Sequence, residues 1–148
     1  MPSLRSILNR LVFGGTSRLQ PHEIAVLNAL APVLSTSDRS VLTQQVSAVS
    51  TVQRFLRGRQ LNIFFGGANP PMLSNLSGDF CLGRLKAQSV VPALSVRVVT
   101  HHGRLSSLEF SRSPSRAFTG PYEPVPESTV VSGSSLPSAT DRLEHGRT

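Results

Sequence analysis

The sequence predicts an α+β domain in which an N-terminal helical hairpin covers one face of an antiparallel sheet of four or five strands. Apolar residues recur at helical spacing between residues 21 and 49, and the period changes to two after residue 50. Ser, Pro, Thr, Gly and Arg then dominate from residue 111 onward. Helices that precede a run of strands are typical of the α+β class.

Residues 1–20 are interpreted as a basic amphipathic lead and linker. Apolar residues recur at helical spacing up to Val12, and the segment contains three arginines and no acidic residue. Such a start is typical of a transit peptide or a membrane-surface helix, and equally of a short helix that packs on the domain. We favour the last alternative. No apolar run approaches the roughly 20 residues that cross a bilayer.

The first helix is predicted over residues 21–34. Pro21 suits the first helical position, and Glu23 suits the positive end of the helix dipole. Pro32 lacks a backbone donor and should weaken the last turn. One apolar face contains Ile24, Leu27, Leu30, Ala31 and Leu34.

The second helix is predicted at about residues 38–48. Ser37 is a suitable N-cap, and Asp38 is a favourable first-turn acid. A turn near Ser35 and Thr36 joins the two helices into the hairpin. The buried face is expected to contain Val41, Leu42, Gln45, Val46 and Val49.

The strands are predicted from alternation and from turn residues. Gly58 separates the first two strands, and Gly83 marks a bulge where the apolar face changes. Gly103 supplies a positive φ in the turn at residues 101–104. In the last strand Leu108 and Phe110 face the core, or Leu105 joins them through a twist. The predicted strands are residues 50–57, 61–65, 80–88, 93–100 and 105–110.

The domain is therefore expected to span residues 21–114, followed by a Pro/Ser-rich disordered tail over residues 115–148. Prolines interrupt any helix or central strand in the tail, and its apolar residues are sparse. As an alternative for part of the tail, residues 117–125 lie on the domain through Phe118 and Tyr122.

Positive charge is concentrated in the middle of the chain. The net charge is +7, from 15 basic and 8 acidic residues, and residues 50–116 alone carry nine basic residues against Asp79 and Glu109. Arg54 and Arg97 are predicted on the water-exposed sheet face. The candidate residues for contacting an anion or a partner are Arg54, Arg57, Arg59, Arg84, Arg97 and Arg104, with Lys86 beside them.

No cofactor, metal or catalytic site is predicted. His101 and His102 are adjacent on a strand, so their side chains point to opposite faces. Glu109 is either a buried acid of a small hydrolase or transferase or, as we favour, the cross-strand partner of Arg97. Cys81, the only cysteine, is interpreted as a core thiol. Neither Gly-Gly pair has the spacing of a phosphate-binding loop.

Two segments carry a resemblance. Residues 49–56 (Val-Ser-Thr-Val-Gln-Arg-Phe-Leu) and 103–110 (Gly-Arg-Leu-Ser-Ser-Leu-Glu-Phe) resemble segments of small uncharacterised α+β proteins of GC-rich bacteria. The second also resembles a hairpin found in some toxin-immunity proteins. The resemblance covers roughly residues 21–114, transfers no catalytic residue, and implies a bacterial, cytoplasmic protein.

The sequence therefore predicts a non-enzymatic module that binds a protein partner through the sheet or through residues 66–79. The alternative is binding of nucleic acid or an anionic surface by the central arginines. Two observations weigh against that alternative. Fourteen of the 15 basic residues are Arg, which is typical of GC-rich coding, and aromatic residues are only 5% of the chain.

Overall fold

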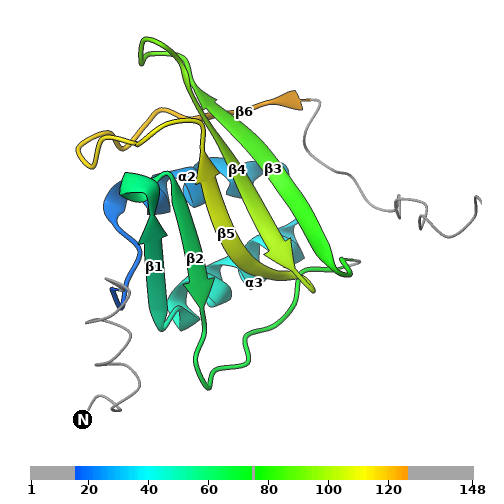
Figure 1. The fold of residues 1–148 in the computed structure, drawn as a ribbon. Coiled ribbons are helices and arrows are strands. Elements are labelled where there is room, and N and C mark those ends of the chain that lie inside the picture. The colour runs from blue at the N-terminus through cyan, green and yellow to red at the C-terminus, as the bar shows by residue number, and fades with distance from the viewer. Residues whose placement is uncertain (1–15, 75, 127–148) are drawn as a thin grey trace, which may run out of the picture.

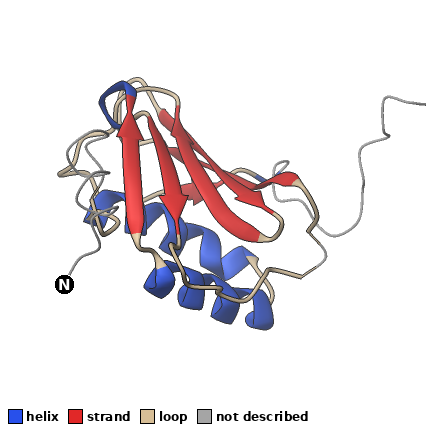
Figure 2. Ribbon diagram, turned by 60° about the horizontal axis from the view of Figure 1, so that its bottom comes forward, coloured by secondary structure: helices blue, strands red, loops and turns tan. Residues whose placement is uncertain are grey.

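The computed structural model describes residues 16–74 and 76–126, and it has the predicted α+β class. Two α-helices lie on one face of a six-stranded antiparallel sheet (Figures 1 and 2). No helix among the described residues covers the opposite face, which we call the open face. The sheet order is β1-β2-β5-β4-β3-β6. Its strands are β1 (Thr51–Phe55), β2 (Gln60–Phe64), β3 (Asp79–Ala87), β4 (Leu94–His101), β5 (Arg104–Phe110) and β6 (Glu123–Pro124).

The helical region differs in detail from the predicted hairpin. Helix α2 (Pro21–Leu30) ends earlier than expected, because the chain tightens into the 3-10 turn η1 (Ala31–Val33) around Pro32. Helix α3 (Thr36–Ala48) begins after Ser35, whose Oγ accepts a hydrogen bond from the Asp38 backbone, so Ser35 and not Ser37 is the N-cap. Helix α2 packs on β3 and β6, whereas α3 packs on β5.

The prediction of four or five strands was wrong, because the sheet has a sixth, short strand, β6. After β5 the chain returns to the far edge of the sheet and pairs with Leu85 and Lys86 of β3. Tyr122 is only 6% exposed, and its ring lies 5.4 Å from that of Phe118. These two aromatic rings bury enough apolar surface to hold the segment, as the alternative for residues 117–125 proposed. Residues 127–148 lie outside the described residues.

The described part of the predicted lead is packed against the domain. Thr16 exchanges two backbone hydrogen bonds with Val52 at the edge of β1, and Leu19 is buried in the core. Residues 1–15 lie outside the described residues. Within the described residues, none of the helices is long and apolar enough to span a membrane.

A bulge in β3 decides which side chains reach the open face. The pairing of β3 with β4 shifts between Cys81 and Gly83, as the sequence predicts. The shift reverses the alternation, so Arg84 and Lys86 lie on the open face while Leu85 is buried on the helix-covered face. A second register shift, between Val99 and Thr100, explains how Leu105, Leu108 and Phe110 are all buried.

Candidate functional site

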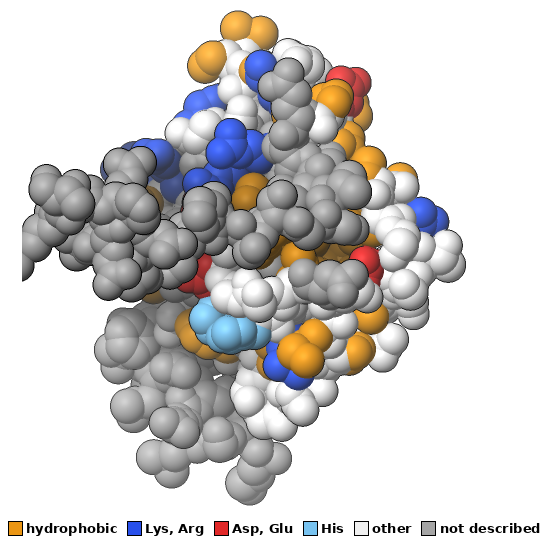
Figure 3. Space-filling model, turned by 90° about the vertical axis from the view of Figure 1, so that its right-hand side faces the viewer, with side chains coloured by type: hydrophobic (Ala, Val, Ile, Leu, Met, Phe, Trp, Pro, Cys, Tyr) orange, Lys and Arg blue, Asp and Glu red, His pale blue; other side chains and the backbone are white. Residues whose placement is uncertain are grey.

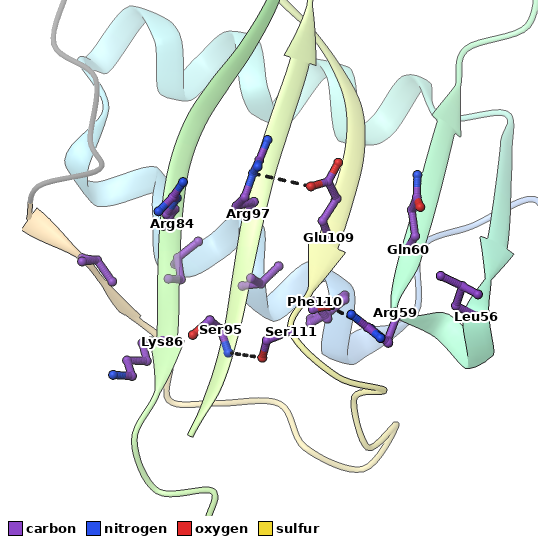
Figure 4. A pocket seen from close by; sticks show the side chains of 13 residues that line it. Leu56, Arg59, Gln60, Arg84, Lys86, Ser95, Arg97, Glu109, Phe110 and Ser111 are labelled. Carbon is purple, nitrogen blue, oxygen red and sulfur yellow. Dashed lines mark hydrogen bonds and ion pairs between the residues drawn. The ribbon is translucent and has the colours of Figure 1, made fainter. Parts of the chain in front are cut away.

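Three of the six candidate arginines meet in one hollow on the open face of the sheet. Arg59, Arg84 and Arg97 line it together with Lys86, and its volume is about 650 Å³ (Figure 4). Seen from the β3 side of the molecule, Lys and Arg side chains gather at the upper left, away from the histidines (Figure 3). The other lining residues are Leu56, Gln60, Leu85, Ser95, Val96, Glu109, Phe110, Ser111 and Val125.

Strand pairing places the charged residues of the hollow in a row across the sheet. Arg84 of β3 is directly opposite Arg97 of β4, which is directly opposite Glu109 of β5. Gln60 of β2 follows Glu109, and Phe55 of β1 follows Gln60. The row is therefore cationic at the β3 and β4 end and apolar at the β1 end.

The charge of the hollow is strongly unbalanced. Among the described residues, its lining carries four cations and one carboxylate, that of Glu109, which is a net charge of +3. Arg97 Nε lies 3.5 Å from Glu109 Oε2, which confirms the predicted cross-strand pair. Both side chains of this pair are well exposed, at 47% and 39%, so Glu109 is not a buried acid. Like charges directly opposite on neighbouring strands are unfavourable. An anion bound between Arg84 and Arg97 would relieve their repulsion.

Leu56, which lines one end of the hollow, belongs to the strained turn η2 (Leu56–Gly58). Leu56, Arg57 and Gly58 have φ angles of 52°, 57° and 81°. The left-handed conformation costs roughly 1–2 kcal/mol for each residue other than glycine. The turn is held in place from β5 and the residues after it, since Phe110 donates its backbone N–H to the Arg59 carbonyl and Ser113 Oγ donates to the Leu56 carbonyl.

The prediction that Arg54 faces water on the open face was wrong. Val52 and Arg54 share the helix-covered face of β1, and the guanidinium of Arg54 forms a two-pronged pair with the Glu23 carboxylate at 2.6 and 2.7 Å. The Glu23 side chain is only 1% exposed. Glu23 also accepts a hydrogen bond from the Gln20 backbone, which closes the first turn of α2. Arg54 is therefore part-buried on the helix-covered face and is not part of the site.

The remaining two candidate arginines also lie outside the hollow. Arg104 is at the opposite end of β5, where its guanidinium donates to the Pro70 carbonyl and to Asn69 Oδ1. Arg57 is exposed on the turn η2 beside Leu56. Sequence reasoning missed Leu56 as a site residue. The signal available for it was a bulky apolar residue two positions before the glycine of a hairpin turn.

The histidine pair and the cysteine singled out in the sequence do not line the hollow. His101 Nδ1 lies 2.6 Å from Asp79 Oδ1 on the exposed surface, and His102 Nδ1 accepts a hydrogen bond from the Gly78 backbone. Cys81 is partly buried. Among residues 16–74 and 76–126, no group of three or more His, Cys, Asp and Glu side chains could hold a metal ion.

A buried histidine beside the Glu23–Arg54 pair makes stability depend on pH. His22 is 3% exposed, and within the described residues its Nδ1 has no hydrogen-bond partner. Burial lowers the pKa of His22 below its usual 6.5; Glu23 opposes this shift, whereas Arg54 and Arg116 add to it.

The lowered pKa of His22 predicts that the folded protein is less stable in acid. The unfolded chain binds a proton at pH values where the folded chain does not, so the free energy of unfolding should fall as pH drops through about 6.5. Urea titrations between about pH 8 and pH 5 should show a smaller fall for His22→Gln than for the wild type. An equal fall in the wild type and His22→Gln would contradict the assignment.

Comparison with known proteins adds no relative: no family model, no curated protein and no solved structure matches the chain. The resemblance to small α+β proteins of GC-rich bacteria therefore stays a prediction.

Proposed function

We propose that the protein is a non-enzymatic binding module and that an acidic segment of a partner protein docks in the hollow on the open sheet face. The observation that carries the proposal is the convergence of Arg59, Arg84, Arg97 and Lys86 on a face that neither described helix covers. These four residues come from β3, from β4 and from the turn before β2, which are separated in sequence. Complementary charge of this kind steers association and selects partners.

The lining of the hollow suits a polypeptide. Leu56 is 67% exposed at the rim, and Val125 lines the hollow beside β3. Apolar side chains beside arginines are the mixture found in protein interfaces, where arginine is enriched and lysine is depleted. Of the lining residues that the structure describes, only Phe110 is aromatic; it is 4% exposed and presents no face on which a base could stack.

Nucleic acid is the second candidate partner, and one observation favours it. Phe55 and Phe64 are 39% and 43% exposed, and strand alternation places both on the open face. Exposed aromatic rings on a sheet that also carries arginines are a known platform for single-stranded RNA and DNA. The two rings lie at opposite ends of the β1–β2 hairpin and outside the hollow, so we rank this candidate below the protein partner.

The bacterial and cytoplasmic setting is part of the proposal and rests on the resemblance of residues 49–56 and 103–110 to small α+β proteins of GC-rich bacteria, some of which are toxin-immunity proteins. A protein partner is the kind of ligand that such a protein would bind.

Fluorescence anisotropy with two labelled probes, a Glu-rich peptide and an oligothymidylate, tests the proposed function. We expect the double variant Arg84→Gln/Arg97→Gln to weaken binding of the peptide by at least about tenfold. The matched control Arg18→Gln/Arg116→Gln removes two exposed arginines that do not line the hollow and should bind as the wild type does. Equal losses in both double variants would mean that only net charge matters, and would overturn the proposal. Tighter binding of the oligothymidylate than of the peptide, with a steep dependence on salt, would establish the second candidate instead.

A further inference from the structure

Resting on the proposed function, we propose that the hollow recognises an extended acidic segment with an apolar side chain about four residues from an acidic one. Leu56 would contact the apolar side chain, and Arg84 and Arg97 would bind the acidic one. The partner is thus defined by two groups at a set separation as well as by its charge.

The separation follows from the row of residues across the sheet. Within this row, Glu109 and Gln60 lie between Arg97 and Phe55, so three inter-strand steps separate Arg97 from Phe55. Neighbouring strands are about 4.8 Å apart, which makes the span about 14 Å. An extended peptide covers that span in about four residues, at about 3.3 Å per residue. Residues four apart on an extended chain point to the same side, so both side chains would face the sheet.

Leu56 is positioned to be the apolar contact. It directly follows Phe55 in the chain, lines the hollow, and lies at the end opposite Arg84 and Lys86 in Figure 4. Its side chain is 67% exposed, so it contributes little to the core. Its φ of 52° is one that Gly or Asn adopts more readily than Leu. The fold therefore gains nothing evident from a leucine at this position, whereas an apolar contact with a partner requires one.

The charge of the site selects the occupant. Glu109 lies in the middle of the row and repels a carboxylate there, while Arg84 and Arg97 at the end of the row attract it. The acidic side chain of the partner would therefore bind at the β3 and β4 end, which leaves the β1 end for an uncharged group.

Two labelled peptides of identical composition test this inference. One has Leu four residues after a Glu, and its isomer has the two side by side, with Ser and Gly elsewhere. We expect the wild type to bind the spaced peptide at least about fivefold more tightly, and Leu56→Asn to abolish the preference. Because Asn tolerates a positive φ, Leu56→Asn should also keep or raise the thermal midpoint of unfolding. The control Val91→Asn changes an apolar side chain that is 92% exposed and does not line the hollow, and should keep the preference.

The outcomes separate this inference from the proposed function. Equal binding of both peptides by the wild type, or an unchanged preference in Leu56→Asn, overturns the inference and leaves the acidic partner standing. A lower thermal midpoint in Leu56→Asn also overturns it, because the leucine would then serve the fold. If the wild type binds neither peptide, the proposed function and the inference both fail.

Discussion

Replacing Arg54 by alanine is expected to destabilise the protein by about 3–5 kcal/mol, because it leaves the carboxylate of Glu23 buried without a counter-charge. Glu23 is 1% exposed, and Arg54 is its two-pronged partner at 2.6 and 2.7 Å. Arg54 also donates to Thr16 Oγ1 and to the Arg18 carbonyl, so the change also removes two hydrogen bonds that hold the segment before α2. Urea unfolding followed by circular dichroism measures the loss.

The exposed pair on the other sheet face provides a matched control. Arg97→Ala removes an arginine from a pair whose side chains are 47% and 39% exposed, and surface pairs of this kind contribute about 0–1 kcal/mol. The double variant Arg54→Met/Glu23→Leu should recover much of the lost stability, since it removes both buried charges together. A loss for Arg54→Ala no larger than that for Arg97→Ala would show that the Glu23 carboxylate is not held as the structure describes.

Replacing Gln45 by leucine is expected to destabilise the protein by about 2–4 kcal/mol, because buried backbone groups lose their hydrogen-bond partner. Gln45 is fully buried; its Nε2 donates to the Pro71 and Gly103 carbonyls, and its Oε1 accepts from the Leu105 backbone N–H. One side chain of α3 thus ties together the loop before β3 and the β4–β5 turn.

The neighbouring glutamine is the control for Gln45. Gln44 is exposed, so Gln44→Leu should change the free energy of unfolding by no more than about 0.5 kcal/mol. Hydrogen exchange adds a local measurement, because the Leu105 amide should lose protection in Gln45→Leu at urea concentrations where the protein remains folded. Unchanged protection of that amide would contradict the assigned hydrogen bond.

Local signals in the sequence were sufficient for most of the elements. The alternation in residues 93–100 and the glycine of the 101–104 turn correspond to β4 and to a turn in which His102 and Gly103 both have positive φ. Gly83 predicted the bulge in β3, and Arg97 with Glu109 was predicted as a cross-strand pair. These features depend on residues that are close in sequence or directly paired in one hairpin, so their physics is local.

The short strand β6 could not be predicted from such local signals. Glu123 and Pro124 have low strand propensity, and the pairing with β3 depends on Tyr122 being buried against the domain. The segment is ordered by tertiary packing and not by its own preference. Sequence reasoning could only name Phe118 and Tyr122 as the residues that would hold it.

The sequence by itself determined the α+β class, the positions of the helices and five strands, and the concentration of positive charge in residues 50–116. Only the tertiary structure decided which arginines share a surface. Arg54 and Arg97 both lie on strands, yet Arg54 is part-buried and paired with Glu23, whereas Arg97 lines the hollow. The physical reason is that the face of a strand residue depends on sheet register and on where the helices pack. Both are set by contacts between residues far apart in the chain, such as Glu23 with Arg54.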